Sequence, residues 1–361
     1  MSAFPRQEWG RCLRTAALEL PTPDLDYGDM RGPARLREAL ADYLGRVRGV
    51  AADPDHLVIT SGFAQGRSLI CQALAIAGIR RVAVEDPSHP EQRAALIHAG
   101  LDVIPIPVDG DGIQAGELPG SGADAVMITP AHQFPAGAVL SGPRRGELAG
   151  WLRGTGAIAV EDDYDAEYRY DRAPIGALQG IEPSRIIYAG SVSKTLAPAL
   201  RIGWLVLPPR LLGPVSDAKR LADLGSNHLE QHALASFLTA GHLDRHLRRM
   251  RPAYRRRREA LVDALTTELP EARIHGVAAG LHVAVALPSY DDEQAIAAAA
   301  RRSGIAIATM ADYRLRAVGP PTLLLGYAQH PEPTFRAGVA ALTPIIHRCR
   351  AQARKQRTLS P

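Results

Sequence analysis

The chain has 361 residues, of which 46% are hydrophobic and 22% charged, a composition typical of a folded globular protein rather than a disordered one. Its length exceeds what one hydrophobic core usually serves, so we expect one large domain and a smaller one. The 42 Lys and Arg residues against 38 Asp and Glu residues give a net charge of +4, which is too mild to indicate a nucleic-acid partner.

The sequence predicts neither secretion nor a membrane span. The beginning, "MSAFPRQEWGRCLRTAAL", carries charges where a signal peptide needs an apolar stretch, and no apolar run approaches the length of a bilayer. Cys12, Cys71 and Cys349 are odd in number and far apart, which predicts neither a disulfide framework nor a metal site. We therefore expect a protein of the reducing cytoplasm.

From about residue 56, short apolar runs alternate with helical patterns. The runs are "HLVITSG", "RVAVEDP", "DVIPIPVD", "DAVMITP", "AIAVEDDY", "RIIYAGS" and "RIGWLVLP", and helix-like segments such as "FAQGRSLICQALAIAG" and "EQRAALIHAG" separate them. Nearly continuous apolar strands separated by helices are typical of a buried, mostly parallel sheet. We predict a large α/β domain over about residues 45–235.

A different pattern follows this region. "LEQHALASFLTAGHLDRHLRRMRPAYRRRREALVDAL" predicts a long helical stretch that Pro252 interrupts, and "GLHVAVAL", "GIAIATM" and "TLLLGYA" predict strands separated by helical segments. We expect a small α+β domain formed by residues 236–361 together with residues 1–44.

The residues just after the predicted strands are the candidates for chemistry, because ligands of such sheets bind beyond the carboxyl ends of the strands. These positions read Ser61-Gly62, Asp86-Pro87, Pro130-Ala131-His132, Asp162-Asp163-Tyr164 and Ser191-Val192-Ser193-Lys194.

Lys194 fits three kinds of site. In an S-x-x-K acyl-enzyme it would need S-D-N-like and K-T-G-like companions, whereas Ser216-Asp217 is followed by Ala218 and Lys194-Thr195 by Leu196. In a phosphate-binding P-loop it would follow a glycine, and Ser193 stands there instead. The third hypothesis is a Schiff base to the aldehyde of pyridoxal phosphate, which requires partners for several other groups.

Several residues could meet the cofactor's phosphate. Ser191 offers a hydroxyl group and Arg201 a permanently charged guanidinium. Gly62, Phe63 and Ala64 lie at a strand end that enters a helix, where main-chain N–H groups and the helix dipole attract anions. We predict a phosphate site assembled from two strand ends.

Asp162 and Tyr164 could meet the cofactor ring. A carboxylate at position 162 would pair with the pyridinium nitrogen and keep it protonated, and the phenol of Tyr164 would bond the phenolic oxygen. Taken alone, an Asp-Asp-Tyr sequence at a strand end is as readily a turn or a helix cap. This alternative stays open at the level of the residues.

Seven blocks in order resemble fold-type I, aminotransferase-like pyridoxal-phosphate proteins, most closely the aminotransferase-like domain of MocR-type regulators in the GntR superfamily. The blocks are "YGDMRGPARLREALADYL", "VITSGFAQG", "VAVEDPSHP", "MITPAHQFPAG", "VEDDYDAEYRY", "SVSKTLAPALRIGW" and "HLRRMRPAYRRRREAL". The resemblance covers nearly the whole chain and implies the fold of pyridoxal-phosphate-dependent transferases.

Carried over residue by residue, the resemblance implies the same roles for Lys194, Asp162, Tyr164, Ser191 and Arg201. It adds that His89 stacks on the cofactor and that Tyr27 reaches the phosphate of the neighbouring subunit in a homodimer. A histidine in a surface turn is the plainer alternative for His89.

Three positions depart from the family pattern. Phe134 stands where aminotransferases carry an asparagine, although MocR-type domains share "HQFP", and Ala64 replaces a polar residue of the phosphate loop. Leu324, in "TLLLGYA", occupies the place of the arginine that grips a substrate's α-carboxylate in many relatives. A leucine cannot hold a carboxylate, so ordinary amino-acid transamination is in question.

Two functional hypotheses result. The first is an aminotransferase-like enzyme that acts on an amine or amino acid through a Lys194 Schiff base. The second is a pyridoxal-phosphate- or amine-sensing effector domain of a MocR-type regulator without turnover, which Leu324 and the resemblance to MocR-type domains motivate. The basic run "RHLRRMRPAYRRRREAL" predicts a solvated helix face, and we do not expect this chain to bind DNA directly.

Overall fold

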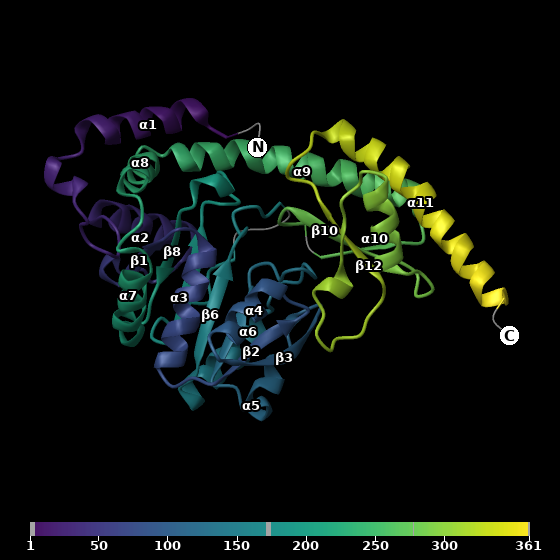
Figure 1. Cartoon of the computed structure of the whole chain (residues 1–361), viewed down its shortest axis with the longest axis horizontal. Helices are drawn as coiled ribbons and strands as arrows, with labels where there is room; N and C mark the ends of the chain where they lie inside the picture. The colour runs from purple at the N-terminus through teal and green to yellow at the C-terminus, as the bar shows by residue number, and fades with distance from the viewer. Residues whose placement is uncertain (1–3, 171–174, 277, 360–361) are drawn as a thin grey trace.

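Two β-sheets organise the chain, and a long helix runs past both (Figure 1). The computed structural model describes residues 4–170, 175–276 and 278–359, and of residues 354–359 only the main chain.

The larger sheet has eight strands in the described part of the chain, in the order β1-β8-β7-β6-β5-β2-β3-β4. The strands are β1 (Leu57–Thr60), β2 (Arg81–Asp86), β3 (Asp102–Asp109), β4 (Gly112–Ile113), β5 (Ala125–Ile128), β6 (Ile158–Asp163), β7 (Ile186–Ser191) and β8 (Gly203–Val206). Strands β3, β2, β5, β6 and β7 pair in parallel, whereas β8 runs antiparallel to both β1 and β7. The predicted mostly parallel α/β sheet is confirmed.

Helices cover both faces of this sheet because successive residues of a strand point to opposite faces and nearly all of them are apolar. Val58 and Leu205 pack with α3 (Phe63–Ile76) and α7 (Pro209–Asp223). On the other face, Ala159 packs with α6 (Gly142–Thr155). The remaining helices of this part are α4 (Pro90–His98) and α5 (Leu118–Ser121).

The N-terminal helices belong to the packing of the large sheet. Helices α1 (Arg6–Glu19) and α2 (Ala34–Arg48) contact α8 (His228–Thr239), and their buried residues share one core with Leu57, Ile59 and Trp204 of the sheet. The assignment of residues 1–44 to the small domain stays a prediction, as do the other domain boundaries.

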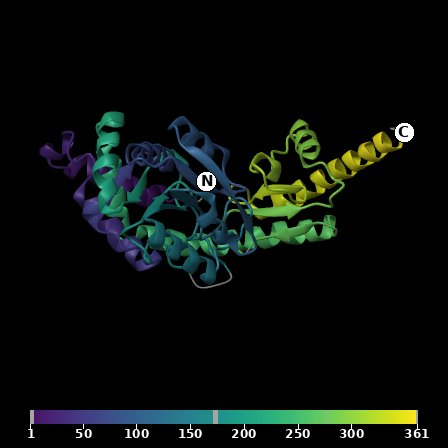
Figure 2. The ribbon, with the colours of Figure 1, turned by 90° about the horizontal axis from the view of Figure 1, so that it is seen from below.

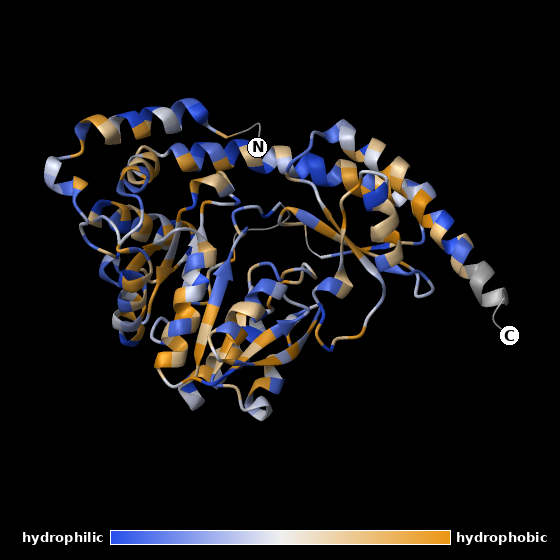
Figure 3. Cartoon of the chain, in the orientation of Figure 1, coloured by the Kyte–Doolittle hydropathy of each residue, from blue (hydrophilic) through white to orange (hydrophobic). Residues whose placement is uncertain are grey.

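The long helical stretch divides at a glycine and not at Pro252, where the sequence pattern placed the interruption. Helix α8 ends before Gly241, whose φ of 67° lies in the left-handed region, and α9 (His242–Glu268) then runs through Pro252 without ending. Proline removes one main-chain hydrogen bond, and the rest of this long helix tolerates that loss. Figure 3 shows hydrophilic residues recurring along α9.

The smaller sheet is antiparallel and has the order β11-β12-β10-β9. Its strands are β9 (Arg273–His275), β10 (His282–Ala286), β11 (Ala308–Thr309) and β12 (Thr322–Gly326), and its helices are α10 (Glu293–Arg302) and α11 (Glu332–Leu359). They share a core with the second half of α9. Figure 2 shows α11 projecting away from the large sheet.

Short 3-10 helices lie at Thr22–Leu25, Pro54–His56, Ala115–Glu117, Pro198–Leu200 and Met310–Asp312. Among the described residues, no helix combines the length and the apolarity that crossing a bilayer requires.

Candidate active site

The reversed direction of β8 brings the expected anion-binding residues together. Thr60 at the end of β1 and Ser191 at the end of β7 both lie opposite Gly203, the first residue of β8. Because β8 runs against its neighbours, the residues before it lie at the edge where β1 and β7 end. Arg201, two residues earlier in the chain, therefore lies beside the turn that follows β1.

Arg201 lies directly against Gly62. Its Nη2 donates a hydrogen bond to the carbonyl of Ser61 at 2.7 Å, and a Cβ atom at Gly62 would come 2.7 Å from Cζ of Arg201. Gly62 has a φ of +80°, and α3 begins at the next residue, Phe63. The first-turn N–H groups of α3, including those of Phe63 and Ala64, lack acceptors within the helix. We call the group formed by Arg201, Ser61, Gly62 and the first-turn N–H groups of Phe63 and Ala64 the Gly62 cup.

A partly buried polar network adjoins the Gly62 cup. The Ser61 hydroxyl lies 3.1 Å from the Ser226 hydroxyl, to which Lys219 Nζ donates at 2.9 Å. Asp223 accepts hydrogen bonds from Lys219 at 2.8 Å and from Gln65 at 2.7 Å, and Gln65 in turn accepts the N–H of Ser61. Sequence patterns pointed to Ser61 but not to its partners in this network, because Ser61 and Ser226 are 165 positions apart and form no local motif.

Lys194 lies in the turn after β7, with its side chain exposed. Burial, above all, lowers the pKa values of His89 and His282, and the positive charge of Lys194 adds to both effects. Lys194 therefore lies within electrostatic range of these two imidazoles. The chain contains only two other lysines, Lys219 and Lys355.

Asp162, near the end of β6, carries a carboxyl group with a strongly perturbed pKa. Burial, followed by the charge of Asp163, raises its pKa to about 8, while the charge of Arg67 opposes the shift. No described residue donates a hydrogen bond to this carboxyl group. Its register partner is Ala189 on β7, the strand that leads to Lys194.

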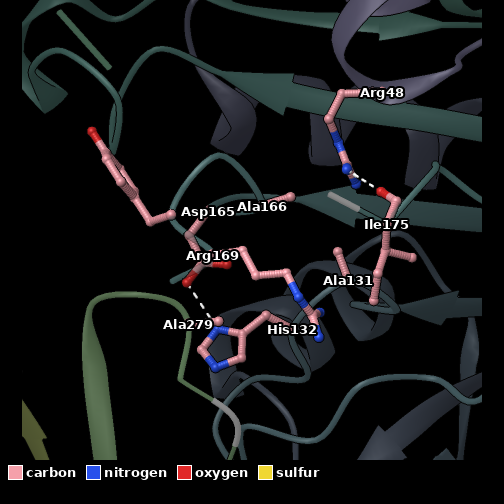
Figure 4. A pocket seen from close by; sticks show the side chains of 9 residues that line it. Arg48, Ala131, His132, Asp165, Ala166, Arg169, Ile175 and Ala279 are labelled. Carbon is pink, nitrogen blue, oxygen red and sulfur yellow. Dashed lines mark hydrogen bonds and ion pairs between the residues drawn. The ribbon is translucent and has the colours of Figure 1, made fainter. Parts of the chain in front are cut away.

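Tyr164 is held by a histidine and a carboxylate. Its hydroxyl lies 3.0 Å from Nδ1 of His132, and the same Nδ1 lies 2.9 Å from Oδ2 of Asp165. Figure 4 shows the contact between Asp165 and His132 at the rim of a small hollow. Both side chains are almost completely buried, and burial raises the pKa of Tyr164 well above its ordinary value. The phenol therefore stays protonated at neutral pH.

Five rings form an aromatic wall, which consists of His89, Phe134, Tyr164, His282 and Tyr313. The ring of Phe134 stacks on His89 with centroids 5.6 Å apart, and it meets Tyr313 and His282 edge-on at 5.2 Å each and Tyr164 at 6.0 Å. The sequence analysis did not identify His282 and Tyr313, because both come from the C-terminal region.

Asp86 holds the loop that carries Tyr313. At the end of β2, its carboxylate accepts hydrogen bonds from the main-chain N–H groups of Leu315 at 2.8 Å, Arg316 at 2.7 Å and Ala317 at 2.8 Å. Asp86 is 2% exposed. The large sheet thus fixes Tyr313, a residue from beyond the small sheet's β11, in the aromatic wall.

Leu324 lies under the aromatic wall. It packs with Ala284 and Met310 in a buried cluster, against which Tyr313 and Ala136 also pack. Tyr27 lies elsewhere: the residue is 67% exposed, and its main-chain carbonyl lies near Gly225. The role of Tyr27 in a neighbouring subunit stays a prediction.

Comparison with known proteins agrees with this geometry. A sequence model of the family "Aminotransferase class I and II" matches residues 11–344. The chain is 33% identical to the uncharacterised HTH-type transcriptional regulator YhdI of Bacillus subtilis, over 94% of this chain and 72% of that protein. It is 30% identical to the HTH-type pyridoxine biosynthesis transcriptional regulator PdxR of Corynebacterium glutamicum, with the same coverage of both chains.

Among solved structures, a kynurenine aminotransferase of Pyrococcus horikoshii superposes with a TM-score of 0.87 and 27% identity, covering 96% of this chain and 88% of that one. Members of the matched family depend on pyridoxal phosphate. The chain belongs to the class I and II aminotransferase family and is similar to the aminotransferase-like region of MocR-type regulators.

Proposed function

We propose that this chain binds pyridoxal phosphate where β1, β6 and β7 end and β8 begins. The family membership supports this proposal, and the donor set fits the cofactor's groups one by one. The Gly62 cup suits a phosphate, because Arg201 supplies a bidentate cation, α3 supplies main-chain N–H groups, and the absent side chain of Gly62 leaves room. Ser191 adds a hydroxyl group at the same edge.

Asp162 fits the ring nitrogen. Its carboxyl group, whose pKa is about 8, has no described hydrogen-bond donor, so a pyridinium N–H would supply both a donor and the opposite charge. When bound, pyridoxal phosphate supplies an electron-withdrawing ring for a substrate joined to it through an amine nitrogen. Asp162 keeps the ring nitrogen protonated, which sustains that withdrawal.

The remaining chemistry falls to Lys194. Its Nζ would hold the cofactor through the aldehyde and, when free, would serve as the base that takes a proton from the substrate carbon next to the nitrogen and returns one. Tyr164, oriented by His132 and Asp165, would donate its O–H to the phenolic oxygen. This contact stands in for the asparagine that Phe134 replaces.

We propose that the protein is an aminotransferase-like enzyme that acts on an amine or amino acid. The observation that carries this proposal is the convergence of Lys194, Asp162, Tyr164 and the Gly62 cup on one sheet edge. The alternative, an effector domain that senses the cofactor or an amine without turnover, is favoured by the regulators among its relatives.

One experiment separates the two functions. The protein loaded with pyridoxal phosphate is incubated with a panel of amino donors, and the cofactor's absorption and the carbonyl product are followed. Conversion to the aminated cofactor with release of product supports the enzyme. A spectral change without product supports the sensor. A protein that retains no cofactor after desalting contradicts both.

We further propose a homodimer in which Tyr27 approaches the partner's cup. Tyr27 and the adjoining Gly225 segment expose apolar residues, with Leu25 at 64% and Leu224 at 52% exposure. Neighbouring exposed apolar side chains are typical of a protein interface. Sedimentation analysis would detect the dimer, and mixing Tyr27→Ala with Lys194→Ala subunits would test the exchange of residues between them.

A further inference from the structure

We propose that the site selects primary amines that have an apolar or aromatic body and lack an α-carboxylate, and that Leu324 sets this preference. The inference rests on the proposed cofactor site and specifies its substrate class. It concerns the side of the site that the C-terminal region supplies.

Leu324 is placed by the register of the smaller sheet. It lies opposite Ala284 of β10 and Ala308 of β11, both of them small, and it is 7% exposed. Met310 completes the buried cluster, and Tyr313 and Ala136 pack against it. An arginine at this position would be surrounded by apolar groups and rings, whereas the apolar side chain of leucine packs against them without a charge to solvate.

The aromatic wall connects this apolar cluster to His89, which lies within electrostatic range of Lys194. Tyr313 packs on the cluster and lies 6.0 Å from His89 and 5.2 Å from Phe134, measured between ring centroids. His89 in turn lies close enough to Lys194 for its charge to act on the imidazole. A substrate whose nitrogen reaches Lys194 therefore places its body against rings and methyl groups.

The wall itself supplies no cation for a carboxylate. The pKa of His282 falls to about 3, mainly because of burial, and its Nε2 donates to the carbonyl of Pro135 at 3.1 Å. Burial likewise lowers the pKa of His89. Both imidazoles are therefore predominantly neutral at neutral pH.

Two arginines near the wall, Arg93 and Arg314, are engaged elsewhere. Arg93 donates to the carbonyls of Ser88 and Tyr313, and Arg314 pairs with Glu293 at 3.4 Å and donates to the carbonyl of Pro320. A substrate carboxylate placed against the five rings of the aromatic wall would lose its hydration without gaining a charged partner from them, which is costly.

Arg67 is the competing candidate for a carboxylate. Its guanidinium lies 5.8 Å from the ring centroid of Phe63, and its charge acts on Asp162 and His89. Its Nε is buried without a hydrogen-bond partner. This position lies toward the ring-nitrogen carboxyl group, so we assign Arg67 to that group and not to the substrate.

The exchange that brings the substrate in is balanced without a co-reactant. The amine nitrogen forms a bond to the aldehyde-derived carbon, the bond from that carbon to Lys194 Nζ breaks, and the two protons of the incoming amine pass to Lys194. A substrate with a neutral, apolar body therefore places no unpaired carboxylate in the site when it takes the place of Lys194.

The test titrates the cofactor-loaded protein with matched pairs and follows the cofactor's absorption. The pairs are 2-phenylethylamine with L-phenylalanine, and isopentylamine with L-leucine. We expect each amine to bind at least about tenfold more tightly than its amino acid, because only the amino acid leaves a carboxylate unpaired. Equal or tighter binding of the amino acids would overturn the inference, as would the absence of a shift with either member.

Variants locate the preference. Leu324→Arg should narrow or reverse the difference within each pair, whereas Leu325→Arg, on the adjacent, partly exposed position of β12, should leave it unchanged. Arg67→Gln provides a second test if Leu324→Arg fails to fold. If Arg67→Gln loses binding of the amino acids but not of the amines, Arg67 binds the carboxylate and the inference is overturned. The absorption of the bound cofactor, recorded before any amine is added, tests the proposed function separately. A protein that shows no such absorption contradicts the proposed function and not the substrate preference.

Discussion

The guanidinium of Arg201 lies over the main chain of Gly62, so closely that a methyl group on Gly62 would stand 2.7 Å from Cζ of Arg201. Two segments that are 139 positions apart thus form the Gly62 cup, since Arg201 Nη2 also bonds the neighbouring Ser61 carbonyl across 140 positions. Because of this contact, even the replacement of Gly62 by alanine would displace Arg201.

Gly62→Ala should weaken the binding of pyridoxal phosphate at least about tenfold, equivalent to about 1.4 kcal/mol, because the new methyl group displaces Arg201. Fluorescence titration of the cofactor-free protein measures the affinity. The matched control is Gly78→Ala, which has nearly the same positive φ, +83° against +80°, but nothing within 4 Å of the new methyl group. Equal losses in both variants would mean that backbone strain, and not the displaced arginine, is responsible.

Lys194→Ala should abolish covalent attachment of the cofactor. Borohydride reduction fixes the cofactor to the lysine that holds its aldehyde, and the chain offers only Lys194, Lys219 and Lys355. Lys219 is engaged by Asp223 and Ser226 and is 1% exposed, so it is not a ready substitute. Intact mass and peptide mapping after reduction check the outcome. A label on either other lysine in the unmodified protein would refute the assignment of Lys194.

Asp162→Asn should change how the stability of the cofactor-free protein depends on pH. The folded state raises the pKa of Asp162 from 3.8 to about 8, so it holds a proton that the unfolded chain releases. This contribution is therefore full below pH 4 and is lost as the pH rises toward 8, at no more than about 1.4 kcal/mol per pH unit.

Urea unfolding of both proteins at pH 5, 6.5 and 8 measures this difference. Glu85 and Glu161, whose pKa values also rise to about 7, contribute equally to both proteins. The asparagine variant should lose less stability than the unmodified protein between pH 5 and pH 8. Parallel curves would show that Asp162 is not protonated in the folded state.

Asp86→Ala should release the loop of residues 315–317. The carboxylate accepts three main-chain hydrogen bonds there, and its removal leaves the N–H groups without their acceptor, at a cost of about 2–4 kcal/mol. Hydrogen exchange should accelerate at these amides and not in the core strands β5 and β6. Asp109→Ala, which removes an exposed pair with Arg144, is the control. Unchanged exchange at residues 315–317 would show that other contacts hold the loop.

The apolar runs correctly predicted seven strands of the larger sheet, because most of these strands are buried and turns that are visible locally interrupt them; the two-residue strand β4 was not predicted. The helical pattern predicted an interruption at Pro252, whereas the break between α8 and α9 lies at Gly241. A proline within a long helix costs one hydrogen bond, whereas a glycine in the left-handed region redirects the chain.

The sequence by itself determined which side chains end the strands, and hence the candidates Gly62, Asp162 and Lys194, because a strand, its turn and the residue after it are neighbours in the chain. Only the tertiary structure decided that β8 runs antiparallel and so carries Arg201 to Gly62. It alone also brought His282 and Tyr313 to Phe134. Strand direction and the docking of the smaller sheet depend on pairings between distant segments, and no local pattern of residues encodes them.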